Sequence, residues 1–77
     1  MTDAAQEAVA LAARTSYGRL VALLTSRTHD VAAAEDALGD AFLRALRTWP
    51  RDGIPNNPDA WLLAAALVLP LLTVALV

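Results

Sequence analysis

Between Val31 and Trp49 the apolar residues recur every three or four positions, which is the spacing of one face of an α-helix. That face comprises Val31, Ala34, Leu38, Ala41, Phe42, Ala45 and Trp49. The opposite face carries Asp36, Asp40, Leu43 and Arg47, with Glu35, Gly39 and Arg44 beside them. The stretch therefore predicts an amphipathic helix that buries one face and presents the other.

Two features of the outward face of this helix indicate a partner rather than water. Asp36 and Asp40 carry like charges one helical turn apart, which costs roughly a few tenths of a kcal/mol in an isolated helix. Leu43 lies among the charged residues with no core to reach. A basic partner would relieve the repulsion and cover the leucine. The alternative is the ordinary solvated face of a helical bundle.

The segment before this helix is also predicted to be helical. Asp3 is a suitable N-cap, and apolar residues at helical spacing follow it to about Ser26, as one helix or as two separated near residues 15–18. Asp30 is the expected N-cap of the central helix. That helix should end near Trp49, because the following proline disfavours helical geometry in the residue before it.

A third helix is predicted after a loop over residues 51–56. Asn57-Pro58-Asp59 combines an N-cap side chain, a proline at the first helical position and a carboxylate near the positive end of the helix dipole. This helix should kink or stop before Pro70. The expected fold is all-α, a single small bundle of three helices joined by short connections.

Size and charge limit the functions open to this chain. Its 77 residues form at most one small domain, and the absence of cysteine excludes disulfides, thiolate metal sites and cysteine nucleophiles. The formal net charge is −2 and there is no basic tract. Autonomous binding of nucleic acid normally requires a clustered positive face, so this function is not expected from composition.

No residue pattern in the sequence supports enzymatic chemistry. The serines and threonines lack an activating neighbour, and the three glycines are too dispersed to form a phosphate-binding loop. His29 has no partner at metal-ligand spacing and is predicted to be an exposed loop residue. Trp49 and Trp61 are expected to serve as core and loop-packing residues. We therefore expect no catalytic site, no cofactor and no metal.

Three segments, taken in order, carry a family resemblance. They are Tyr17–Leu24, then Ala34–Leu46 with Trp49-Pro50, and then Asn57-Pro58-Asp59-Ala60-Trp61-Leu62-Leu63. Over roughly residues 14–64 the chain resembles region 2 of the extracytoplasmic-function sigma factors of the sigma-70 superfamily. Gly39 departs from that pattern, because the family more often has glutamine or another helix former there. Glycine at this position costs about 1 kcal/mol relative to alanine.

The resemblance implies both a role and a partner. The family acts in DNA-templated transcription initiation, and its acidic helix docks on the coiled-coil clamp helices of the largest subunit of core RNA polymerase. Carried over to this sequence, the polymerase-binding residues would be Asp36, Asp40, Leu43, Arg44 and Arg47. The implied location is the cytoplasm.

The last part of the chain differs from the family pattern. Every charged residue lies within residues 1–59, so residues 60–77 are uncharged. In the family, this helix continues into an arginine-rich segment that melts and reads the promoter, whereas Ala66–Pro70 occupy its place here. We therefore expect a partial region 2-like domain over residues 1–64 and an apolar tail over residues 65–77. Contact with promoter DNA then follows only from the family role.

Three interpretations of the apolar tail remain open. It could be the product of a truncated or frame-shifted gene, or a hydrophobic element packed on the preceding helices. Residues 60–77 as a whole could instead be a membrane anchor near the lower limit of spanning length, without flanking positive charges to orient it. The predicted function is a sigma-factor-like fragment that binds core RNA polymerase but lacks promoter recognition. The alternative is a small membrane-associated helical protein with no role in transcription.

Overall fold

The computed structural model describes the backbone from Asp3 to Leu76 and the side chains as far as Val68. This part of the chain contains four α-helices: α1 (Ala4–Thr15), α2 (Tyr17–Thr28), α3 (Val31–Asp52) and α4 (Pro58–Leu76). The all-α bundle is confirmed, but the expected number of three helices was wrong. The N-terminal helical segment forms two helices, which is one of the two alternatives predicted for it.

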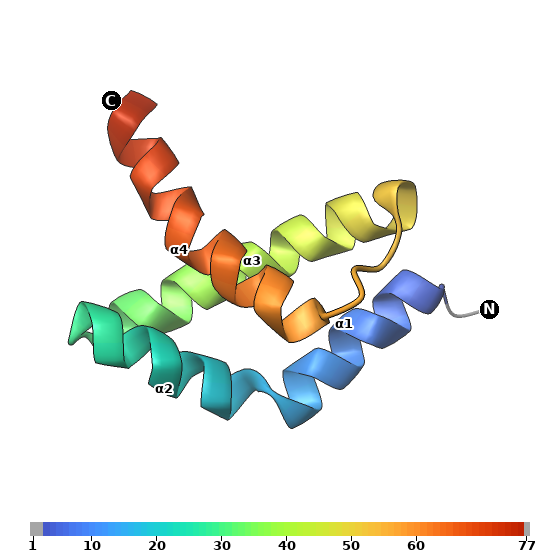
Figure 1. Ribbon diagram of the computed structural model, residues 1–77, viewed down its shortest axis with the longest axis horizontal. Helices are drawn as coiled ribbons and strands as arrows, with labels where there is room; N and C mark the ends of the chain where they lie inside the picture. The colour runs from blue at the N-terminus through green and yellow to red at the C-terminus, as the bar shows by residue number, and fades with distance from the viewer. Residues whose placement is uncertain (1–2, 77) are drawn as a thin grey trace.

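The division between α1 and α2 falls at Ser16. This residue has φ −121° and ψ −11°, outside helical geometry, yet both of its backbone groups are bonded. Its N–H donates to the carbonyl of Ala12 at 2.9 Å, and its carbonyl accepts from the N–H of Leu20 at 2.9 Å. The chain therefore turns at Ser16 without leaving a backbone donor or acceptor unpaired, and α2 sets off at an angle to α1 (Figure 1).

The predicted N-caps are present at the starts of three helices. The carboxylate of Asp3 accepts from the N–H of Ala5 at 2.9 Å, and that of Asp30 accepts from Ala33 at 3.1 Å. The side-chain oxygen of Asn57 accepts from the N–H of Ala60 at 3.1 Å. Each cap satisfies a backbone donor that has no partner within its helix, so these boundaries follow from local chemistry.

The predicted end of α3 near Trp49 was wrong. Of the two alternatives predicted for α4 at Pro70, a stop was wrong and a kink stays a prediction. Helix α3 runs through Pro50 to Asp52, where Gly53 ends it with φ 98° and donates its N–H to the carbonyl of Trp49 at 2.9 Å. Pro50 loses its own backbone hydrogen bond and crowds the carbonyl four residues before it, which costs about 3 kcal/mol in a helix interior, and the burial of Trp49 opposes that cost. Helix α4 likewise continues past Pro70 to Leu76.

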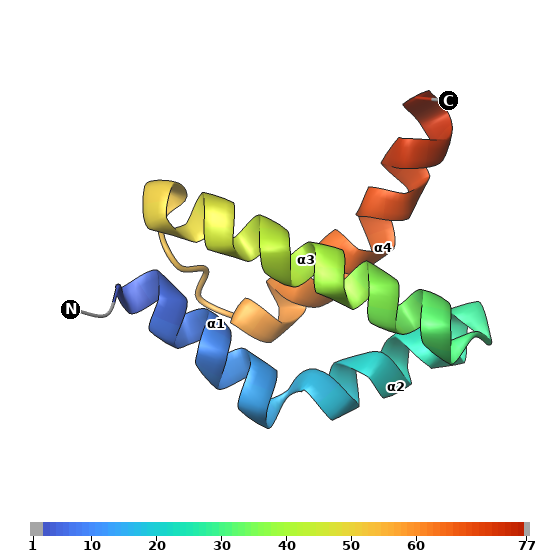
Figure 2. The same ribbon diagram turned by 180° about the vertical axis from the view of Figure 1, so that it is seen from behind.

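Helix α3 is the centre of the bundle and contacts all three other helices. Helices α1 and α2 follow one side of it, and the first half of α4 crosses it (Figures 1 and 2). The buried apolar residues are Ala5, Val9, Ala12, Leu20, Leu24, Ala34, Leu38, Ala41, Ala45, Trp49, Leu62 and Ala66. Half of them are alanines, which let the helices approach closely, and leucines fill the remaining space.

The inward face of α3 is largely as predicted. Five of its seven expected residues are buried, and Phe42 is half-buried with its ring stacked on Tyr17, the ring centroids 6.2 Å apart. Val31 is the exception, with 53% of its surface exposed. It is the first residue of the helix, so the helices that cover later turns do not enclose it.

The second half of α4 extends away from the other helices (Figure 1). Before that point Leu62 and Ala66 are buried, and Leu67 packs partly against the core. Leu69–Val77 lie outside the residues whose side chains are described, so the three interpretations of the tail and the division at residue 64 stay predictions. Within the described part of the chain, no helix is long and apolar enough to cross a membrane.

Candidate protein-docking face on α3

The five residues predicted to contact a partner all lie exposed on α3. They are Asp36, Asp40, Leu43, Arg44 and Arg47, and we call this set the α3 outer face. Figure 2 shows α3 uncovered by the other helices on that side of the molecule. Their arrangement follows from helical spacing alone, because the buried residues of α3, which are three alanines, Leu38 and Trp49, occupy the opposite side.

Leu43 is the most unusual member of the α3 outer face. It is 54% exposed, although a leucine gains free energy when its side chain leaves water. Leu46, which the sequence-based prediction omitted, adds a second apolar side chain that is 41% exposed. Its position three residues after Leu43 is the signal that could have identified it. Together they form a small apolar centre on an otherwise charged surface.

The charges on this face are segregated along the helix. Asp36 and Asp40 lie on the N-terminal side of Leu43, and Arg44 and Arg47 lie on the C-terminal side. None of these four groups forms an ion pair with any side chain that the structure describes. The face therefore presents two adjacent charged patches of opposite sign, both available to a partner.

One edge of the α3 outer face borders α4. Arg44 lines a shallow groove of about 260 Å³ with Trp61, Ala64, Ala65 and Val68. Trp61 packs against the core as predicted, and its ring meets that of Trp49 edge-on with the centroids 5.3 Å apart. Its packing on the loop stays a prediction. The extension of the face onto α4 could not be seen in the sequence, because it depends on how the two helices cross.

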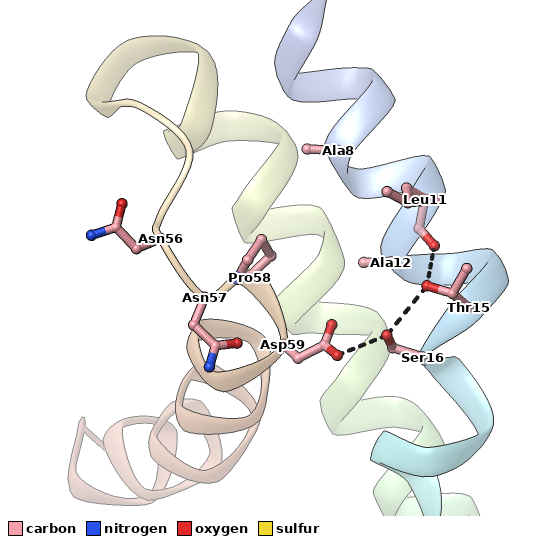
Figure 3. Close-up of a pocket in the computed structure, with 9 residues that line it drawn as sticks. All are labelled: Ala8, Leu11, Ala12, Thr15, Ser16, Asn56, Asn57, Pro58 and Asp59. Atoms are coloured by element: carbon pink, nitrogen blue, oxygen red, sulfur yellow. Dashed lines mark hydrogen bonds between the residues drawn. The ribbon is translucent and has the colours of Figure 1, made fainter.

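A polar cluster on another side of the bundle connects the α1–α2 junction to the start of α4. The hydroxyl of the buried Ser16 donates to a carboxylate oxygen of Asp59 at 2.8 Å, and Arg19 forms an ion pair with the same oxygen. Figure 3 shows Asp59 pointing toward Ser16 beside a pocket of about 270 Å³. These contacts join distant segments of the chain, so we assign the cluster a structural role.

His29 occupies the exposed position predicted for it. It ends α2 with φ 58°, and its N–H donates to the carbonyl of Thr25 at 2.7 Å. Among the residues described, no group of histidine and carboxylate side chains is arranged to hold a metal ion.

Comparison with protein families identifies the domain. The family model for sigma-70 region 2 matches residues 12–67, which include all of α2 and α3 and the first half of α4. The chain belongs to the sigma-70 region 2 family. Members of this family are non-enzymatic domains of transcription initiation factors that bind core RNA polymerase. The matched residues contain the whole α3 outer face.

Other comparisons cover less of the chain. An uncharacterized protein of Rhizobium meliloti (strain 1021) is 53% identical over 30 residues, which amount to 39% of this chain. The aligned stretch spans 7% of that relative's length. No solved structure matches the chain significantly.

Proposed function

We propose that this chain docks on core RNA polymerase through the α3 outer face, in the manner of an extracytoplasmic-function sigma factor. The receiving surface is the coiled-coil clamp helices of the largest subunit. The observation that carries the proposal is Leu43, a half-exposed leucine in the middle of unpaired charges, within the segment that matches region 2. Such a partner would place the chain in the cytoplasm.

The chemistry of the face supports a charged helical partner. Basic groups opposite Asp36 and Asp40 would convert their mutual repulsion into attraction, and acidic groups would pair with Arg44 and Arg47. Burial of Leu43 against the same partner would remove apolar surface from water. Two helices of a coiled coil can supply both kinds of contact along one line.

We further propose that docking does not lead to promoter opening by this chain alone. Phosphate neutralisation by lysine and arginine dominates affinity for DNA, and no basic residue follows Arg51. Helix α4 is uncharged from Ala60 onward, where the family pattern has an arginine-rich segment. The function is therefore polymerase binding without independent promoter selection.

Titration of the full chain against an isolated clamp coiled coil tests the docking face. Asp40→Arg should weaken binding by about 1 kcal/mol or more, because it reverses a charge in a complementary interface. Glu7→Arg is the matched control, since it makes the same type of reversal at an exposed position on α1. Equal affinities for wild type and Asp40→Arg would refute the assignment of this face.

A transcription assay tests the second part of the proposal. Purified chain with core polymerase should give no promoter-specific run-off transcript and no open complex. A specific transcript from this mixture would show that promoter recognition does not require the missing basic segment.

A further inference from the structure

The order of charges on α3 makes its outer face complementary to itself. Acidic residues precede Leu43 and arginines follow it, so a second copy of α3 running in the opposite direction presents arginines to the acids and acids to the arginines. A face that is complementary to its own reversed copy is the requirement for a two-fold symmetric, isologous dimer.

Helix geometry brings the charges into register. Asp40 precedes Leu43 by three residues and Arg47 follows it by four, which places them about 4.5 Å and about 6 Å from Leu43 along the helix axis. In an antiparallel pair centred on Leu43, Asp40 of one copy therefore lies within about 1.5 Å of the level of Arg47 of the other. The pair occurs twice by symmetry.

The lateral positions of the two charges also agree. Asp40 and Arg47 are seven residues apart, nearly two full turns, so they lie on the same side of the α3 outer face. A two-fold axis perpendicular to both helices leaves this lateral side unchanged. Asp40 of one copy and Arg47 of the other therefore lie on the same side of the contact.

The centre of such a pair is apolar and accessible. Leu43 would meet Leu43 of the second copy, with the two Leu46 side chains beside them, and both residues are more than 40% exposed in the single chain. No described side chain forms an ion pair with Asp40 or Arg47 within the single chain. Figure 2 shows that no other helix covers α3 from this direction.

We propose that two copies of this chain associate through an antiparallel α3–α3 contact centred on Leu43. Because the contact uses the α3 outer face, it excludes any other partner from that face while the dimer persists. The dimer itself does not depend on polymerase docking. If docking also occurs there, self-association and docking compete.

Sedimentation equilibrium of the full chain, from micromolar to millimolar concentration, tests the proposal. The wild type should show a monomer–dimer equilibrium that weakens as salt is raised. Asp40→Arg and Arg47→Asp should each weaken self-association about tenfold or more, because each brings like charges together twice per dimer. Leu43→Ala should also weaken it, whereas Leu23→Ala, an exposed leucine on α2, should not.

Exchange of the two charges provides the decisive measurement. An equimolar mixture of Asp40→Arg and Arg47→Asp chains should form heterodimers, and the double variant should again form homodimers, because both restore opposite charges across the contact. Far-ultraviolet circular dichroism checks that every variant keeps its helical content. A chain that stays monomeric throughout, or an association that ignores these charges, overturns the proposal.

The double variant also separates this proposal from polymerase docking. It restores self-association, but the charges on the clamp helices are unchanged, so its docking stays weak. Weak docking together with restored self-association in the double variant supports both proposals. Docking as strong as that of the wild type would refute docking through these charges, and a double variant that stays monomeric would refute the dimer.

Discussion

Removal of the Asp59 carboxylate should destabilise the bundle by about 2–5 kcal/mol. Asp59 accepts a hydrogen bond from the hydroxyl of Ser16, which is only 5% exposed, and a hydrogen bond to a charged group contributes about 1.5–3 kcal/mol. The ion pair with Arg19 adds little, about 0–1 kcal/mol, because the arginine side chain is 65% exposed. Favourable interaction of Asp59 with the α4 dipole adds about 0.3–1 kcal/mol.

Double-mutant cycles can separate these contributions. Urea unfolding, followed by circular dichroism and by the fluorescence of the two tryptophans, gives the free energy of unfolding for each variant. The cycle of Ser16→Ala with Asp59→Ala should show a coupling of about 1 kcal/mol or more, and the cycle of Arg19→Ala with Asp59→Ala about 0.5 kcal/mol or less. Asn57→Ala is the control that removes a cap on the same helix without touching Ser16.

The outcome that refutes this reasoning is a reversed order of the two couplings. If the coupling free energy from the Arg19 cycle exceeds that from the Ser16 cycle, the exposed ion pair connects α2 to α4 and the buried hydroxyl does not. If Asp59→Ala leaves the free energy of unfolding unchanged, the cluster does not hold the α1–α2 junction against α4.

Five substitutions test other parts of the fold by the same unfolding measurement. Gly39→Ala should raise the free energy of unfolding by about 0.5–1 kcal/mol, because alanine favours the helix and the added methyl group has no neighbouring atom to clash with. Gly53→Ala should lower the free energy of unfolding, because the positive φ of this residue strains an alanine. A loss of stability in Gly39→Ala would show that the position is constrained. Leu62→Ala should cost about 2–5 kcal/mol, because Leu62 is fully buried, and Leu43→Ala should change stability by about 0.5 kcal/mol or less. Asn57→Ala should cost about 1 kcal/mol as a lost cap, and no change would contradict the cap at α4.

Local chemistry explains why much of this fold could be predicted from the sequence. The caps at Asp3, Asp30 and Asn57 bond to amides two or three residues away, so neighbouring residues suffice to identify them. The inward and outward faces of α3 follow from helical periodicity, and the exposure of Leu43 confirms that pattern.

One helix boundary that the sequence left open and one that it predicted wrongly both depend on distant contacts. The break at Ser16 is held by a carboxylate 43 positions away, at Asp59. Helix α3 passes through Pro50 while Trp49 is buried against Trp61, which belongs to another helix. Local preference opposed the second of these outcomes, and packing outweighed the lost hydrogen bond and the steric crowding that Pro50 introduces.

The α3 outer face shows the same division. Its five predicted residues and their order of charge are properties of one helix, so the sequence alone determined them. Its limits depend on how the helices pack. Because α4 crosses α3, Arg44 lines a groove at one edge together with Trp61 and Val68. In the same way, Val31 of the inward face is exposed because it lies beyond the helices that enclose the rest of that face. Periodicity specifies which residues share a face, but only the packing of other helices decides how much of that face remains open.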